Sequence, residues 1–292
     1  MKKCLYVESR SIGDNIAAIP YLDMYRDGDT EIYVSINDNL IQYFEKEYPL
    51  IKFVARDRVS DFSDIQILRY DFNKSVQGGY AFQLGFDPAP YIRPRMDIPT
   101  GIRPIKGKYI AIGVHSTAQL KYWNHPKGKR FQPESTYWNE LCGMIRKAGY
   151  TPVVVERDEL FGAPPFFNGL PSKSNKKWGQ SFNESMNLIY HSEFYIGISS
   201  GMSWVAHALG KRVAMIANFT EDWNEFDLSL PDYKRITNKS VCHGCWNKIG
   251  IDHGFDGGDW YWCPKHKDTD RQFECHTSIT PERVFEEIKD WL

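Results

Sequence analysis

A strand, a tight turn, a short apolar helix and a second strand fit into 22 residues at positions 195–216, YIGISSGMSWVAHALGKRVAMI. This arrangement is typical of an open α/β sheet. The turn at Ser199, Ser200 and Gly201 leads into the helix, whose first unpaired backbone N–H groups and positive dipole end attract anions. The segment therefore predicts a phosphate site, and a serine-capped turn is the structural alternative.

No GxxxxGK[ST] or GxGxxG motif accompanies this turn. A P-loop nucleotidase and a dinucleotide-binding dehydrogenase are disfavoured for that reason. The turn instead favours a nucleotide or diphosphate held mostly by backbone and hydroxyl groups. The candidate residues all lie at one helix terminus and are Ser199, Ser200, Gly201, Met202 and Ser203.

The composition is that of a globular protein, with 42% hydrophobic and 25% charged residues in a chain of 292. The formal net charge of −1 gives no general attraction to nucleic acid or to anionic membranes, although residues 106–129 are locally basic. No apolar run reaches the length of a signal-peptide core or a membrane span. We therefore expect a cytoplasmic protein.

Alternating apolar and amphipathic stretches predict two α/β halves. In the first half we expect strands at 5–7, 31–35 and 51–54 and helices at 15–25 and 40–47. In the second we expect strands at 109–113, 152–155, 194–198 and 213–216 and helices at 134–148, 181–191, 202–209 and 281–292, the last with Thr280 as N-cap.

The stretch at 97–108 is rich in Pro, Gly and basic residues and separates the two halves. It predicts a first domain of residues 1–103 and a second of residues 104–292. Two such domains enclose a cleft between the carboxyl edges of their sheets, and ligands bind there.

A carboxylate, Asp14, follows the first predicted strand in the sequence SIGDNIAAIP. At the mouth of the cleft it is suited to take a proton from an attacking hydroxyl, as a general base does. The structural alternative is a helix N-cap after the turn at Gly13. The two roles do not exclude each other.

Hydroxyl groups and a lysine follow the strand that opens the second half, in HSTAQLKYW. Ser116, Thr117 and Lys121 can hold a diphosphate there, with Lys121 neutralising the charge that grows on a leaving group. We interpret His115, beside this strand, and His207, in an Ala-rich helix, as structural residues.

Four of the six cysteines lie close together near the carboxyl end of the chain. Cys242 and Cys245 form a C-x2-C pair, Cys263 follows after 17 residues and Cys275 after a further 11. Four thiolates suit a tetrahedral Zn²⁺ or Fe site, which would close a Gly- and Asp-rich loop that cannot order itself by burial. Disulfides are the alternative, disfavoured in a cytoplasmic setting.

Full thiolate coordination leaves no open position, so this predicted metal finger at 242–276 is assigned a structural role. Four histidines nearby could each replace a cysteine as ligand: His243, His253, His266 and His276. Cys4 and Cys142 lie in a predicted strand and helix and are expected to be buried apolar residues.

The run GDNIAAIPYLDMYR, followed by YIGISSGMSWVAHALGKRVAMI, resembles the heptosyltransferases of the GT-B fold. Together with HSTAQLKYWNHPKG, NFTEDWNEF, VCHGCWNK and DWYWCPKHKDTDRQFEC, it looks like the narrower family of autotransporter-modifying heptosyltransferases over nearly the whole chain. The resemblance implies two Rossmann-like domains and transfer of heptose from ADP-heptose to protein serines with inversion. It also implies an iron bound by four cysteines.

The resemblance further implies roles for single residues. Asp14 becomes the base, Lys121 the diphosphate partner, and Ser200 and Gly201 part of the phosphate turn. Cys242, Cys245, Cys263 and Cys275 become the iron ligands, and Phe219 and Thr220 lie close to the expected donor pocket.

We therefore expect an inverting glycosyltransferase that needs no catalytic metal. Its expected partners are a nucleotide sugar, an acceptor protein or glycan, and further copies of the chain in a homo-oligomer. Two alternatives stay open. One is a hexosyltransferase, for instance with a UDP-glucose donor, acting on a glycan, a small molecule or a modified nucleic-acid base. The other is a non-catalytic metal-finger binding protein.

Overall fold

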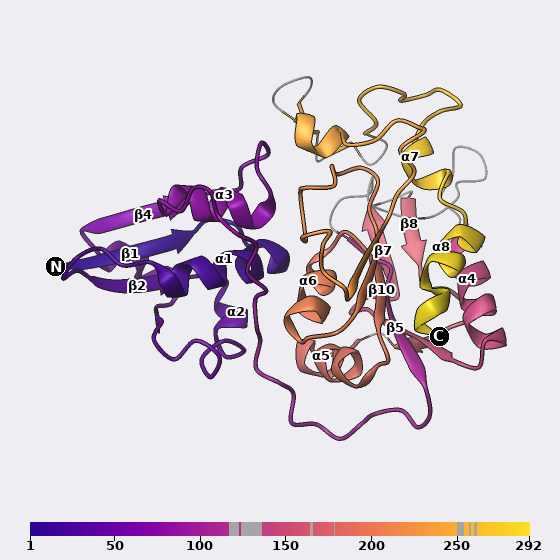
Figure 1. Cartoon of the computed structure of the whole chain (residues 1–292), viewed down its shortest axis with the longest axis horizontal. Coiled ribbons are helices and arrows are strands. Elements are labelled where there is room, and N and C mark those ends of the chain that lie inside the picture. Colours follow the sequence, from indigo (N-terminus) through magenta and orange to yellow (C-terminus); the bar gives the residue numbers. More distant parts are fainter. Residues whose placement is uncertain are drawn as a thin grey trace.

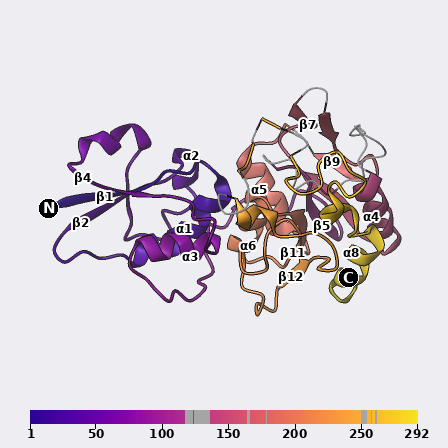
Figure 2. The ribbon, with the colours of Figure 1, turned by 90° about the horizontal axis from the view of Figure 1, so that it is seen from above.

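Two parallel β-sheets organise the chain, and each forms the centre of its own lobe (Figures 1 and 2). A computed structural model describes residues 1–116, 123, 136–163, 166–177, 179–249, 254–256, 258–259 and 262–292. The first sheet has the strand order β3-β2-β1-β4 and the second the order β12-β11-β10-β5-β6-β9. The predicted α/β class is therefore confirmed.

The first lobe alternates strands and helices as predicted, with a further strand at Asp64–Leu68 and a further helix at Val76–Gln83 that the sequence analysis did not predict. Its elements are β1 (Lys2–Val7), α1 (Ile12–Met24), β2 (Glu31–Ser35), α2 (Asp38–Ile41), β3 (Lys52–Phe53), η1 (Arg56–Asp61), β4 (Asp64–Leu68) and α3 (Val76–Gln83). The predicted helix at 40–47 is wrong, because α2 ends at Ile41 and turns follow. Tyr43 and Phe44 donate backbone hydrogen bonds to residues three positions back, so their side chains are buried without an α-helix.

The second lobe contains the six-stranded sheet and the carboxyl-terminal elements. These are β5 (Tyr109–Gly113), α4 (Thr136–Lys147), β6 (Thr151–Val155), β7 (Leu160–Ala163), β8 (Phe166–Gly169), β9 (Asn175–Lys177), α5 (Phe182–His191), β10 (Tyr195–Ile198), α6 (Gly201–Ala208), β11 (Val213–Ile216), β12 (Tyr233–Ile236), η3 (Cys245–Lys248), α7 (Glu274–Thr277), α8 (Pro281–Ile288) and η4 (Lys289–Trp291). Among the described residues, no helix is long and apolar enough to cross a bilayer.

Local cap signals in the second lobe act as the sequence predicts. Thr280 accepts a hydrogen bond from the Arg283 N–H at the start of α8, and Pro281 is the first residue of that helix. At α5, Ser181 and Glu184 form a reciprocal capping box. These caps explain why both helices begin close to their predicted positions.

Residues 84–108 connect the lobes without a helix or strand and run from α3 to β5 (Figure 1). The segment is bound to both sides. Arg93 forms an ion pair with Asp232, and the Met96 N–H donates to the Ala208 carbonyl at 3.3 Å. The Asp97 N–H donates to Tyr43 of the first lobe at 2.8 Å.

The lobes also meet directly where α1 packs on α6, and one hydrophobic core cluster includes residues of both. Two glycines allow this contact. A Cβ atom at Gly201 would lie 2.8 Å from the Cβ atom of Ile12 and 3.3 Å from the Gly13 nitrogen, and one at Gly13 would lie 2.8 Å from Trp204 Cδ1. Side chains at either position would push the two helix starts apart.

We predict that Gly201→Ala lowers the free energy of unfolding by roughly 1–3 kcal/mol, because the added methyl group overpacks the α1–α6 contact. The control is Gly143→Ala inside α4, where the added atom would meet only Lys173 side-chain atoms at 3.7–3.8 Å. That change should stabilise the protein by about 0.5–1 kcal/mol. Urea unfolding of both variants measures the difference, and equal stabilities would contradict the packing argument.

Candidate active site

The loops that carry the predicted site residues leave the sheets where the strand order reverses. In the first sheet the reversal lies between β1 and β4, and the loop after β1 leads to Asp14. In the second it lies between β10 and β5, and the loops after these strands hold the Ser199 turn and Ser116. In open α/β sheets ligands bind at such points.

Asp14 lies in the first turn of α1, and Ser9 Oγ donates a hydrogen bond to its Oδ2 at 2.5 Å. The interpretation of Asp14 as an N-cap is wrong, because the helix already begins at Ile12 and Ser11 occupies the cap position. A carboxylate in the first helical turn is stabilised by the dipole. Ser9 therefore orients Asp14, a role that the sequence analysis did not foresee.

The carboxyl edge of the first sheet is held together by Arg56. Its guanidinium donates to the carbonyl groups of Val7 at 2.7 Å, Ser9 at 2.6 Å and Ile36 at 2.9 Å, and thus joins the ends of β1 and β2. The buried Asn15 adds a bond from Nδ2 to the Ser11 carbonyl at 2.6 Å. The loop that presents Asp14 is therefore rigid.

Two tyrosines from other elements lie within electrostatic range of Asp14. Burial raises the pKa of Tyr70 and of Tyr80 far above the ordinary value, and the Asp14 carboxylate adds to the rise in both. Tyr80 is fully buried on α3, and Tyr70 follows β4. Both hydroxyls therefore stay protonated beside the carboxylate.

The Ser199 turn lies beside the start of α1, the helix that carries Asp14, because Gly201 contacts Ile12 and Gly13. Gly201 and Met202 are the first two residues of α6, so their backbone N–H groups have no partner within the helix. The Ser200 hydroxyl oxygen is buried, and its side chain lies near the buried Tyr195 hydroxyl. The N-termini of α1 and α6 thus bring two positive dipole ends to one place, which suits an anion.

Three other hydroxyls that were predicted to bind the donor, those of Ser199, Ser203 and Thr220, have partners within the protein. Ser199 and Thr220 donate to the buried Glu225 carboxylate, and Ser203 donates to the Ile198 carbonyl at 2.8 Å. Their side chains stabilise the turn itself. In this structure any anion contact from the turn therefore comes from backbone N–H groups and Ser200.

A buried ion pair between Arg235 and Glu225 lies behind these hydroxyls, with side chains 2% and 3% exposed. Arg235 also donates to the carbonyl groups of Ala217 at 2.6 Å and Thr220 at 2.8 Å. The pair fixes residues 217–225 against β12. The sequence analysis missed both residues, because nothing in their local sequence indicates that they meet.

Phe219 is fully buried and packs toward the cysteine region, with its ring 5.7 Å from Trp246 and 6.1 Å from His276. His207 is also fully buried, as predicted, and stacks on Phe226 with a centroid distance of 4.3 Å. Burial lowers its pKa to about 3, so it is a neutral core residue.

Ser116 follows β5 and is partly buried, whereas the predicted Thr117 and Lys121 lie outside the described residues. The end of β5 is held by Glu156, which accepts backbone hydrogen bonds from Val114 at 2.5 Å and His115 at 2.9 Å. Burial raises the pKa of Glu156 to about 8, although these two hydrogen bonds oppose the rise. Glu156 follows the apolar strand β6, so its position at the carboxyl edge could have been predicted.

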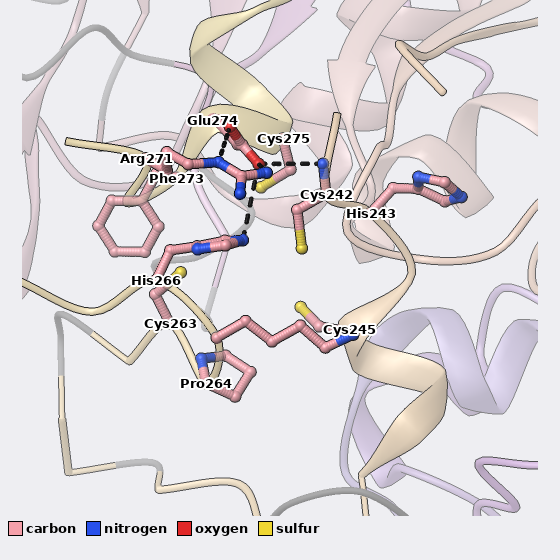
Figure 3. A pocket seen from close by; sticks show the side chains of 11 residues that line it. Cys242, His243, Cys245, Cys263, Pro264, His266, Arg271, Phe273, Glu274 and Cys275 are labelled. Carbon is pink, nitrogen blue, oxygen red and sulfur yellow. Dashed lines mark hydrogen bonds and ion pairs between the residues drawn. The ribbon is translucent and has the colours of Figure 1, made fainter. Parts of the chain in front are cut away.

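None of the six cysteines forms a disulfide, which disfavours the disulfide alternative. Cys4 and Cys142 are buried in the core as predicted. Figure 3 shows the four others in one pocket, which they line together with His243, His266, Arg271 and Glu274. His253 lies outside the described residues.

The chemistry of this pocket fits a bound cation. Burial raises the pKa of Cys245 to about 12, and Cys263 and Cys242 add to the rise. Burial likewise raises the pKa of Cys275 well above its ordinary value, with contributions from the other three thiols. Deprotonation of these thiols is therefore costly without a metal ion, and a bound metal ion would reverse that penalty.

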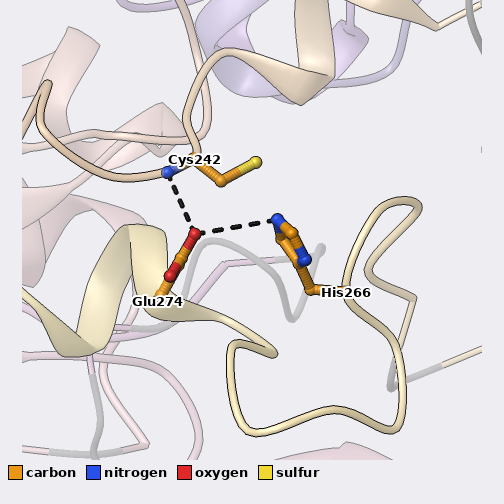
Figure 4. A group of neighbouring side chains, drawn as sticks. All are labelled: Cys242, His266 and Glu274. Carbon is orange, nitrogen blue, oxygen red and sulfur yellow. Dashed lines mark hydrogen bonds and ion pairs between the residues drawn. The ribbon is translucent and has the colours of Figure 1, made fainter.

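A smaller group in the same pocket contains Cys242, His266 and Glu274, whose possible ligand atoms lie within 4.8 Å of one another (Figure 4). The Glu274 carboxylate, however, already accepts from the Cys242 N–H at 3.1 Å and pairs with Arg271. Glu274 therefore ties the first cysteine loop to α7, which carries Cys275. Among the described residues, no three of the four thiols meet the same 4.8 Å limit, so the four-cysteine site stays a prediction.

Known proteins resemble this chain in both sequence and structure. The autotransporter heptosyltransferase TibC of Escherichia coli O78:H11 (strain H10407 / ETEC) is 30% identical over 94% of this chain and 67% of its own length. The chain belongs to the autotransporter heptosyltransferase family. BAHTCr of Citrobacter rodentium (strain ICC168), another autotransporter heptosyltransferase, is also 30% identical, over the same shares of both chains.

The crystal structure of TibC, described as an iron-containing dodecameric glycosyltransferase, matches all of this chain and 77% of its own with a TM-score of 0.85 at 28% identity. A second TibC structure contains ADP-D-beta-D-heptose. A relative of Burkholderia thailandensis (strain ATCC 700388 / DSM 13276 / CCUG 48851 / CIP 106301 / E264), 29% identical over 72% of this chain and 46% of its own, is named the inactive autotransporter heptosyltransferase BimC. No family model matches.

These matches confirm the resemblance found in the sequence, and with it the GT-B fold and membership of the glycosyltransferases. They do not identify the residues that act in this chain. The geometry around Asp14, the α6 terminus and the thiol pocket therefore carries the functional assignment.

We predict that Glu156 makes the free energy of unfolding fall as the pH rises from about 5 to about 8. Its folded-state pKa of about 8 lies above the ordinary value of 4.5, so between these values the folded protein binds more protons than the unfolded chain and loses stability as pH rises. In Glu156→Gln, which keeps an acceptor for both N–H groups, the melting temperature should fall less between about pH 5 and pH 8. Exposed Glu45→Gln is the control, and parallel profiles for wild type and Glu156→Gln would refute the assignment.

Proposed function

We propose that this protein transfers heptose from ADP-heptose to an acceptor hydroxyl with inversion at the anomeric carbon. The observation that carries the proposal is the position of Asp14, at the start of α1 and directly beside the N-terminus of α6. One carboxylate and one anion-binding helix terminus then face each other across the lobe contact. The ADP-heptose complex of the related TibC supports the choice of donor.

In the proposed reaction, Asp14 accepts the proton of the acceptor hydroxyl while the oxygen of that hydroxyl attacks the anomeric carbon. The bond from that carbon to the β-phosphate oxygen breaks, and ADP leaves with the electron pair. The N–H groups of Gly201 and Met202, the Ser200 hydroxyl and Lys121 would stabilise the negative charge on the departing diphosphate. Ser9 would keep Asp14 oriented.

We further propose a first domain of residues 1–103, on the acceptor side, and a donor-binding domain of residues 104–292. The acceptor would be a serine hydroxyl of an autotransporter, in keeping with the names of the relatives. Assembly into a homo-oligomer is part of the proposal, since TibC is described as dodecameric.

The proposed metal is iron, held by Cys242, Cys245, Cys263 and Cys275. The four cysteines that line one pocket and the iron-containing relative TibC support this choice. Bound there, the metal would crosslink three loop segments and take no part in the transfer. Zn²⁺ would satisfy the same ligands, so metal analysis decides between them.

A non-catalytic metal-finger protein is the second candidate, because BimC is named inactive. One measurement distinguishes the two functions. Incubation with ADP-heptose and a co-expressed autotransporter passenger domain, followed by mass spectrometry, shows a heptose added to the passenger only if the chain is an active transferase. Binding of ADP-heptose without transfer or donor hydrolysis would favour the second candidate.

We predict that Asp14→Asn lowers kcat by about 10²–10⁴-fold, because the amide cannot accept the proton. The melting temperature and the affinity for ADP should change little, since the amide keeps the shape and an acceptor oxygen for Ser9. The control is Asp29→Asn, which removes an exposed carboxylate from the same lobe. An Asp14→Asn enzyme with wild-type turnover would rule out Asp14 as the base.

We predict that Cys245→Ser loses the bound metal and melts at a lower temperature, because a serine hydroxyl is a poor ligand for iron or zinc. Cys142→Ala is the control, since it removes a buried core thiol far from the pocket residues in the sequence. Elemental analysis of both purified proteins should show metal only in the control. Retained metal with an unchanged melting temperature in Cys245→Ser would overturn the structural role.

A further inference from the structure

The loop with the first two cysteines is bound to both lobes. Toward the second lobe, the Gly244 and Trp246 N–H groups donate to the carbonyl groups of Asn218 at 3.1 Å and Phe219 at 3.0 Å. Toward the first lobe, Trp246 Nε1 donates to the Tyr70 hydroxyl at 3.1 Å. The thiol pocket is therefore connected to the lobe that carries Asp14.

A second set of contacts strengthens this connection. Asn247 Nδ2 donates to the Asn224 side-chain oxygen at 2.6 Å and to the Phe72 carbonyl at 3.3 Å, and the Val76 N–H donates to the Asn224 carbonyl at 2.7 Å. Asn224 and Asn247 are both buried. The rings of Phe72 and Trp246 pack edge to face with a centroid distance of 5.4 Å.

Tyr70 connects this network to the strand end that leads to Asp14. It follows β4, whose Leu68 pairs with Val7 of β1 and accepts the Glu8 N–H at 3.0 Å, immediately before the loop that presents Asp14. The Tyr70 hydroxyl accepts from Trp246 and donates to Asn224 Oδ1 at 3.3 Å. Its position beside the Asp14 loop is thus set by residues of the other lobe.

We propose that Tyr70 is a positioning residue. Through Tyr70, a well-ordered cysteine loop keeps the loop that carries Asp14 in its position. Trp246 and Asn224 hold the Tyr70 hydroxyl, and the Tyr70 side chain in turn limits the positions open to the Asp14 loop. Activity then depends on the cysteine pocket although none of its thiols touches substrate. This inference rests on the proposed function of Asp14, but its structural part can be tested without turnover.

The test compares Tyr70→Phe, Trp246→Phe and the double variant. Both single changes keep an aromatic ring and remove one partner of the same hydrogen bond. We expect each to lower kcat for ADP release from ADP-heptose by about tenfold, the value of one buried hydrogen bond, and the double variant to be no slower than the singles. Metal content should equal that of wild type, because neither residue is a ligand.

Hydrogen exchange provides the readout that does not depend on catalysis. In all three variants the backbone amides of residues 9–14 and of Val76 should exchange about tenfold faster than in wild type. The control is Tyr150→Phe, which removes the hydroxyl that donates to the Leu292 carbonyl in the second lobe and should leave both readouts unchanged.

Two results would overturn the inference. One is unchanged exchange of residues 9–14 in Tyr70→Phe, and the other is additive losses of kcat in the double variant. If wild type releases no ADP from ADP-heptose, the proposed function fails. The exchange experiment still decides whether Tyr70 transmits order between the two loops.

Discussion

The contact between the N-termini of α1 and α6 is the constraint on which the rest of the structure depends. Two helices whose first turns meet can do so only if no side chain stands between their backbones, and Gly13 and Gly201 meet that condition. The contact aligns positive dipole ends from both lobes. The Asp14 carboxylate lies beside them, so the proposed function brings proton acceptance and anion binding together at this contact.

Around this contact, buried polar networks keep loops in place where apolar packing cannot. Arg56 joins the strand ends of the first sheet, and the Arg235–Glu225 pair holds residues 217–225 of the second. Removing one partner of such a buried pair leaves an uncompensated charge, which costs about 3–5 kcal/mol. The loops of the site are therefore formed before any ligand arrives, which reduces the entropy lost on binding.

Much of the fold could be predicted from the sequence, because its strongest signals are local. The apolar periods and the tight turn at 195–216 gave β10, α6 and β11 to within a residue or two. The candidate site was predictable only in part. Ser199 and Thr220 were expected to face a donor, but their hydroxyls bond to Glu225, whose partner Arg235 comes from another strand.

The remaining features of the site depend on contacts between residues far apart in the sequence, and sequence periodicity does not indicate such contacts. Tyr70 and Trp246 are 176 residues apart in the sequence, and only the folded chain brings the indole N–H to the phenol oxygen. The same holds for Ser9, whose bond to Asp14 depends on where α1 begins. Glu156 is different, since a charged residue at the end of an apolar parallel strand is a recognisable edge position.

The attachment of the cysteine loop to both lobes has a consequence for the catalytic cycle. A hinge rotation that separates the lobes would have to break the bonds of Trp246 and Asn247 to the first lobe together with the Arg93–Asp232 pair. These bonds would break at the same time, so a wide opening is costly. Spent nucleotide should therefore escape through local loop movement, with the lobes remaining docked between successive turnovers.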